Sequence, residues 1–101
     1  MNNLLKIIFF NFLFFSFVFS EESLNDDDYY KKGVKLYDQG DFKKSFIVFF
    51  NLSEKGNKDA IYNLSNMYSE GIGTVQDYNS ALKYTWLCSL NGNNKCIKKN
   101  K

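Results

Sequence analysis

The sequence predicts an all-α fold, a short α/α solenoid of two helix-turn-helix units followed by the start of a third. Apolar residues recur at helical spacing in four segments, a glycine follows each of these segments, and two stretches of chain repeat at a fixed offset. Proline is absent, which permits uninterrupted helices. The 101 residues, 45% of them hydrophobic, suffice for one small domain.

An internal repeat supports the solenoid. Residues 56–60 recur as 92–96, an offset of 36, whereas Tyr37 corresponds to Tyr68 at an offset of 31. The difference of five residues is an insertion at 72–76, so the second unit has the longer turn. One pair of such helices cannot bury its apolar face alone, and we therefore expect neighbouring pairs to stack.

Four helices are expected, each with an apolar stripe and with start and stop signals. Their ranges are about 27–39, 42–55, 58–70 and 78–90. The expected stripes are Tyr30, Val34 and Tyr37; Phe42, Phe46, Phe49 and Phe50; Ala60, Leu64, Met67 and Tyr68; and Ala81, Leu82, Tyr84, Trp86, Leu87, Cys88 and Leu90. The expected closing residues are Gly40, Gly56, Gly71 and Gly92. The expected N-caps are Asp41, Asn57, Asp77 and Asn93.

Residues 1–20 are typical of a secretory signal. Lys6 precedes an apolar run, 7–19, and the acidic residues that begin at Glu21 favour cleavage after Ser20. One alternative is an uncleaved membrane anchor, although the apolar stretch 4–19 is shorter than the ~20 residues that span a bilayer. The other alternative is a buried core helix. A signal implies export: a periplasmic or secreted protein, or the endoplasmic-reticulum lumen in a eukaryote, and an oxidising compartment.

Behind this signal the chain divides into four parts. We expect an acidic segment at 21–28 and a first helical unit at 29–56. A second helical unit follows at 57–92, and residues 93–101 begin a third unit and form a basic tail.

Composition excludes several functions. The chain has no Arg and no His, which excludes an arginine clamp on phosphate, a histidine base and a histidine-ligated metal. After residue 20 there are 12 lysines against 11 acidic residues, a balance unlike that of a nucleic-acid-binding protein. The acidic run 26–28 is either a cation site or, as we expect, favourable charge at a helix N-terminus. We expect no cofactor and no metal.

The two cysteines are expected to form a disulfide. Cys88 falls in the last turn of one predicted helix and Cys96 in the first turn of the next, within reach of each other. Closing the loop between them stabilises the fold by roughly 2–3 kcal/mol in the chain-entropy model. Buried free thiols and a metal or redox role are the alternatives, and two cysteines without histidine make a poor metal site.

Two groups of residues are candidate sites. Ser80 and Lys83 fit the S-x-x-K pattern of serine β-lactamases, but neither K-T-G nor S-D-N occurs in the chain, so an ordinary exposed helix surface is the expectation. Tyr62, Asn63 and Asn66, with Tyr29 and Lys35, would form a wall that binds a peptide through phenol and amide groups, with core packing as the alternative.

The second unit resembles a Sel-one-like repeat, a relative of the tetratricopeptide repeat with a longer turn. The matching residues are Ala60, Leu64, Tyr68, Gly71, Gly73, Val75, Asp77, Ala81 and Tyr84. In this pattern the alanines let helices approach, the glycines supply unusual backbone angles, the valine plugs the turn into the core and the aspartate caps the next helix. The first unit is more similar to a plain tetratricopeptide unit, and the resemblance spans 30–96.

The resemblance also implies functions. The chain is similar to exported cysteine-rich proteins of this family, which have one cysteine pair per repeat. Many of those proteins are named β-lactamases or penicillin-binding proteins. In this chain the first unit has Leu52 and Ala60 at the positions of such a cysteine pair. We expect a scaffold that binds a protein or peptide without catalysis, contacts membrane only through its signal and self-associates, if at all, through its open C-terminal end. β-Lactam hydrolysis and an adaptor role in endoplasmic-reticulum quality control are the alternatives.

Overall fold

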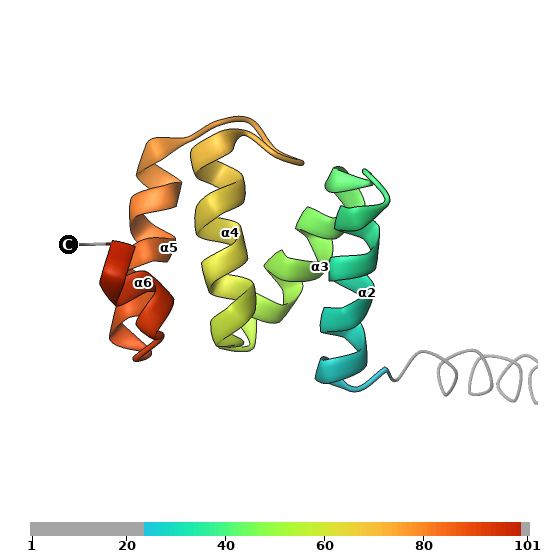
Figure 1. Ribbon diagram of the computed structural model, residues 1–101, viewed down its shortest axis with the longest axis horizontal. Helices are drawn as coiled ribbons and strands as arrows, with labels where there is room; N and C mark the ends of the chain where they lie inside the picture. The colour runs from blue at the N-terminus through green and yellow to red at the C-terminus, as the bar shows by residue number, and fades with distance from the viewer. Residues whose placement is uncertain (1–23, 100–101) are drawn as a thin grey trace, which may run out of the picture.

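The computed structural model describes residues 24–99, and this part of the chain is all-α, as predicted. Its helices are α2 (Asp26–Asp38), α3 (Phe42–Glu54), α4 (Lys58–Glu70), α5 (Tyr78–Leu90) and α6 (Asn94–Lys99). Each helix packs against the next one along the chain, and Figure 1 shows them arranged in a row from α2 to α6. The predicted signal at 1–20 lies outside the described residues.

Local capping explains why the helices begin where they do. The side chain of Asn57 accepts from the backbone N–H of Ala60 at 2.9 Å, and that of Asp77 accepts from Asn79 at 3.0 Å, so both predicted caps are confirmed. Asp41 occupies the N-cap position of α3, as predicted, but the expected side-chain capping bond is not formed: its carboxylate lies 3.6 Å from the ammonium of a lysine one turn later.

The start of α2 was missed by one residue. Its cap is Asn25, whose side chain accepts from the backbone N–H of Asp28 at 2.8 Å. The acidic residues 26–28 therefore form the first turn of the helix, where negative charge is favourable.

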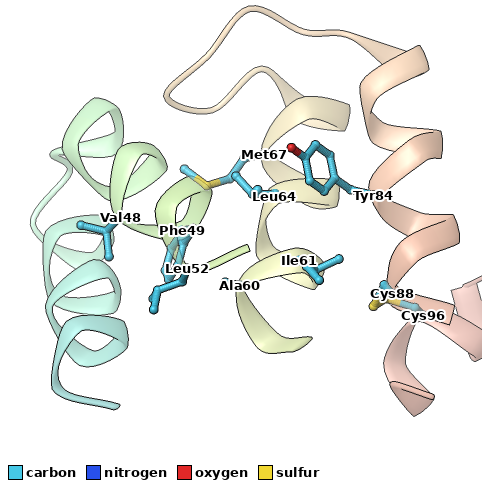
Figure 2. Close-up of a cluster of buried hydrophobic side chains, with 10 residues drawn as sticks. All are labelled: Val48, Phe49, Leu52, Ala60, Ile61, Leu64, Met67, Tyr84, Cys88 and Cys96. Carbon is cyan, nitrogen blue, oxygen red and sulfur yellow. A yellow bond between two sulfur atoms is a disulfide. The ribbon is translucent and has the colours of Figure 1, made fainter. Parts of the chain in front are cut away.

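The hydrophobic core lies along α3, α4 and the inner side of α5 (Figure 2). Leu52, Ala60 and Leu64 have no exposed surface, and Phe49 and Met67 are each 2% exposed. Because α4 sits between α3 and α5, its buried residues lie on both of these sides. The core members are Val48, Phe49, Leu52, Ala60, Ile61, Leu64, Met67, Tyr84, Cys88 and Cys96.

Small residues lie where paired helices cross. Ser45 on α3 is fully buried, and its hydroxyl donates to the carbonyl oxygen of Gly33 on α2 at 2.8 Å. Ser65 on α4 is also fully buried, and it shares a hydrogen bond with Thr85 on α5, next to the buried Ala81. Both helix pairs thus use a small residue and a hydroxyl hydrogen bond at the crossing.

The loop between α4 and α5 reaches back towards α3 (Figure 1). Gly71 and Gly73 have φ values of 71° and 73°, a left-handed conformation that suits glycine. Gly73 passes so close to the carbonyl of Phe42 that a side chain would collide with it. Val75 does not plug the core, contrary to expectation: it is 84% exposed, because Ile72 and the backbone of Gly73 make the inward contact.

The expected stripes were partly wrong on three helices. On α2, Gly33 is buried and Tyr29, Tyr30 and Leu36 pack against the core, so Tyr30 is confirmed as a core-facing residue, whereas Val34 and Tyr37 are each 37% exposed. On α5 the buried face is Ala81, Tyr84, Thr85 and Cys88, and the outer residues of the predicted stripe, Leu82, Trp86 and Leu90, are exposed. On α3, Phe42 and Phe50 also lie at the exposed edge.

Candidate functional site

A groove of about 490 Å³ separates α2 from α4, with the side chain of Phe49 from α3 between them. Both helices run in the same direction, with α3 returning the chain between them (Figure 1). The groove is lined by Tyr30, Val34, Tyr37, Phe49, Tyr62, Asn63, Asn66, Met67, Glu70 and Ile72.

The groove combines an apolar floor with polar walls. Phe49 and Met67 are almost completely buried and form its base. Across the base, the side-chain amide of Asn63 donates to the phenol oxygen of Tyr30 at 3.1 Å, which fixes both groups in place. Glu70 supplies a carboxylate, so among the described lining residues the formal charge is negative.

One wall of the groove continues towards α6. The ammonium of Lys95 lies 5.3 Å from the centre of the Tyr62 ring, within the range of a cation–π interaction. Lys95 adjoins Cys96, which a disulfide joins to Cys88 on α5. The wall residue Tyr62 therefore contacts a short helix that is covalently held.

The residues of the predicted wall do not all lie together. Tyr62, Asn63 and Asn66 line the groove, but Tyr29 does not: its phenol oxygen accepts from Asn51 on α3 at 3.2 Å. Lys35 lines a shallower hollow along α2.

The α2 side of the groove is formed by residues that sequence reasoning assigned to the core. Tyr30, Val34 and Tyr37 occupy that side, at the helical spacing on which their predicted stripe was based. Tyr30 also packs against Phe49 in the core, as predicted, whereas Val34 and Tyr37 lie at the exposed edge of the groove.

Ser80 and Lys83 are not arranged as a catalytic pair. The hydroxyl of Ser80 donates to the carboxylate of Asp77 at 2.7 Å, as part of the α5 cap. The ammonium of Lys83 lies over the Tyr84 ring, 5.5 Å from its centre. The hydrogen bond from Ser80 is the main reason that the pKa of Asp77 is lowered.

An aromatic column joins the two helix pairs. Tyr68 on α4 packs edge-on against Phe46 at 5.3 Å between ring centres and stacks on Tyr84 at 5.5 Å. Burial is the main reason that the pKa of Tyr68 is raised, and the nearby Tyr84 and Asp77 raise it further. This column fixes the second pair against the first and so contributes to the shape of the groove.

The cysteines form a buried disulfide, with 5.8 Å between the Cα atoms of Cys88 and Cys96. Over residues 24–99 there is no free thiol and no cluster of three or more carboxylate, thiol or imidazole groups that would hold a metal ion. No helix within that range is long and apolar enough to cross a membrane.

Comparison of the chain with protein-family models, with curated proteins and with solved structures gives no match in any of the three.

Proposed function

We propose that the protein is an exported scaffold that binds an extended peptide or a protein segment in the groove between α2 and α4, without catalysis of its own. The observation that supports this is the groove itself, which has a buried apolar base, oriented phenol and amide groups and a carboxylate. Ligand sites typically combine an apolar surface with a few placed polar groups.

The chemistry of the groove defines the ligand. An apolar side chain of the ligand would contact Phe49 and Met67, and the side-chain amides of Asn63 and Asn66, which line the same groove, would exchange hydrogen bonds with the backbone of a ligand that lies along α4. Glu70 favours a basic residue at one end of the bound segment. The proposed ligand is thus an extended peptide with an apolar residue followed or preceded by Lys or Arg.

The proposed architecture is a short Sel-one-like solenoid. Two features support it: the two helix pairs have the same crossing chemistry at Ser45 and Ser65, and the glycines of the long turn have the backbone angles that such a turn needs. Stacked helix pairs offer their first helices as a continuous surface, which here consists of α2 and α4.

A random peptide library displayed against the purified protein tests the proposal. We expect enrichment of sequences that pair an apolar residue with a basic one. The protein variant Asn66→Ala should bind an enriched peptide about fivefold to tenfold more weakly than the parent protein does, which is the cost of roughly one hydrogen bond. Glu70→Gln should remove the preference for the basic residue.

The matched control is Asn79→Ala, on the exposed side of α5, since the hydrogen bond that Asn79 donates to Asp77 comes from its backbone N–H and survives the substitution. Equal losses in Asn66→Ala and Asn79→Ala would contradict a site in the groove. So would a library that yields no binder.

The β-lactam-hydrolysing alternative rests on the resemblance and the cysteine pair. Ser80 bonded to Asp77 and Lys83 lying over Tyr84 do not favour it. Nitrocefin turnover by the purified protein, abolished in Ser80→Ala, would reinstate it. Export is tested by the intact mass of the protein isolated from its source, which should begin at Glu21.

A further inference from the structure

The two ends of the α4 wall carry opposite charges. At one end the carboxylate of Glu70 lines the groove. At the other end the ammonium of Lys95 lies 5.3 Å from the centre of the ring of Tyr62, which also lines the groove. Because Tyr62 and Glu70 belong to the same helix, their positions are separated by about 12 Å along its axis.

The segment that carries Lys95 is fixed at two points. The neighbouring residue, Cys96, is joined to Cys88 on α5 by the buried disulfide. Asn93, which directly precedes α6, donates from its side-chain amide to the backbone carbonyl of Lys58 at the start of α4, at 3.4 Å. A helix as short as α6 does not persist on its own hydrogen bonds, so these two links position Lys95 at the end of the groove.

The contact with Tyr62 leaves the charge of Lys95 available to a ligand. An ammonium has three hydrogen-bond donors, and Lys95 is exposed to solvent. Within residues 24–99 no carboxylate lies within ion-pair distance of it. An acidic group that approached this end of the groove would therefore meet an uncompensated positive charge.

The charges of α2 have the same order as those of the α4 wall. The two helices run in the same direction (Figure 1), and a hollow beside the groove is lined in chain order by Lys31, Lys35 and Asp38. The acidic residues 26–28 line neither the groove nor this hollow. Among the residues that do line them, positive charge thus precedes negative charge along both helices.

We propose that the groove selects an extended peptide with two opposite charges about four residues apart, a basic residue at Glu70 and an acidic residue at Lys95. An extended chain rises about 3.3 Å per residue, so roughly three to four residues cover the distance between the two groups. Such a peptide binds in one direction, because the reverse direction places like charges together at both ends. This inference rests on the proposed peptide groove and adds Lys95 to it as a specificity-determining residue.

Selection from a random heptapeptide library by the parent protein and by Lys95→Gln tests the inference. The parent should enrich Asp or Glu at about three to five positions from Lys or Arg, and the variant should lose only the acidic enrichment. In an enriched peptide, replacing the acidic residue by its amide should weaken binding to the parent about twofold to fivefold, the range of an exposed ion pair. The same replacement should leave binding to Lys95→Gln unchanged, and 0.5 M salt should remove most of the difference in the parent.

Lys83→Gln is the matched control. The ammonium of Lys83 also lies over a tyrosine ring, that of Tyr84, but Tyr84 does not line the groove. The control therefore loses the same charge from the same kind of contact, and it should select the same peptides as the parent. Replacing Cys88 and Cys96 by alanine releases α6 and should abolish the acidic preference, as Lys95→Gln does. Far-ultraviolet circular dichroism verifies that each variant is folded.

The possible failures of this inference and of the peptide groove differ. Acidic enrichment that persists in Lys95→Gln, or that is lost equally in Lys83→Gln, would overturn the role of Lys95. Acidic enrichment that persists in the folded cysteine variant would overturn the role of the disulfide in positioning it. Peptides that carry only apolar and basic residues would refute the two-charge ligand and leave the peptide groove intact, whereas a library without any binder would refute both.

Discussion

Replacing Gly33 by alanine tests the contact between α2 and α3 directly, because two effects of opposite sign meet at this residue. Gly33 lies in the interior of α2, where alanine is favoured over glycine by about 1 kcal/mol. If the helix stood alone, Gly33→Ala would therefore stabilise the protein.

The packing around Gly33 reverses this expectation. A Cβ atom there would lie 2.8 Å from a ring carbon of Phe49 and 2.9 Å from a methyl carbon of Val48. Both side chains are core residues, 2% and 4% exposed, so a shift of either one disturbs the packing between α2 and α3. The hydrogen bond from Ser45 to the carbonyl of Gly33 also holds α2 at this distance. Overpacking of this kind costs roughly 1–3 kcal/mol.

We therefore expect Gly33→Ala to lower the free energy of unfolding by up to about 2 kcal/mol, the overpacking cost less the gain of about 1 kcal/mol in helix propensity. The melting temperature should fall by about 4–8 °C for each kcal/mol in a domain of this size. Urea and thermal denaturation, followed by circular dichroism at 222 nm, measure both quantities.

The matched control is Lys32→Gly, at the neighbouring exposed position of the same helix. It should cost about 1 kcal/mol, which calibrates propensity without packing. A Gly33→Ala variant more stable than the parent would refute the close approach of α2 and α3, and with it the buried face assigned to α2.

Three further changes test other parts of the fold. Replacing both Cys88 and Cys96 by alanine should lower the free energy of unfolding by about 2.5 kcal/mol, for a nine-residue loop, and urea denaturation of both forms measures the loss. Gly73→Ala should destabilise more than Gly40→Ala, since both have positive φ but only the first would collide with α3; equal melting temperatures would contradict that contact. The lowered pKa of Asp77 stabilises the folded state above its usual value of 3.8, and this contribution is lost as the pH falls through the lowered pKa. The stability difference between the parent and Asp77→Asn should thus shrink below about pH 4 in acid titrations of unfolding, and a difference that stays constant would show that the cap bond is absent.

Helix positions were predictable because their signals are local. The ranges of α4 and α5 agree with the sequence prediction, since a capping side chain precedes each and a glycine follows α4 directly. Asp41 shows the limit of such signals: the residue type suits a cap, but its carboxylate makes an ion pair instead.

The orientation of α2 was not predictable in the same way. The spacing of Tyr30, Val34 and Tyr37 identifies an apolar stripe but not which neighbour it meets. The buried face is set by Gly33, where α3 approaches most closely, and glycine contributes nothing to an apolar pattern. Tyr30 packs against the core and also lines the groove, whereas Val34 and Tyr37 line the groove and are partly exposed.

Only the α4 side of the groove was predictable as a binding surface from the sequence. Tyr62, Asn63 and Asn66 could be selected because amide and phenol groups on one helix are unusual for a core. Their partner Tyr30 lies 33 residues earlier than Asn63, and only the return of the chain through α3 brings the two side chains together. Long-range pairs of this kind leave no mark in local spacing.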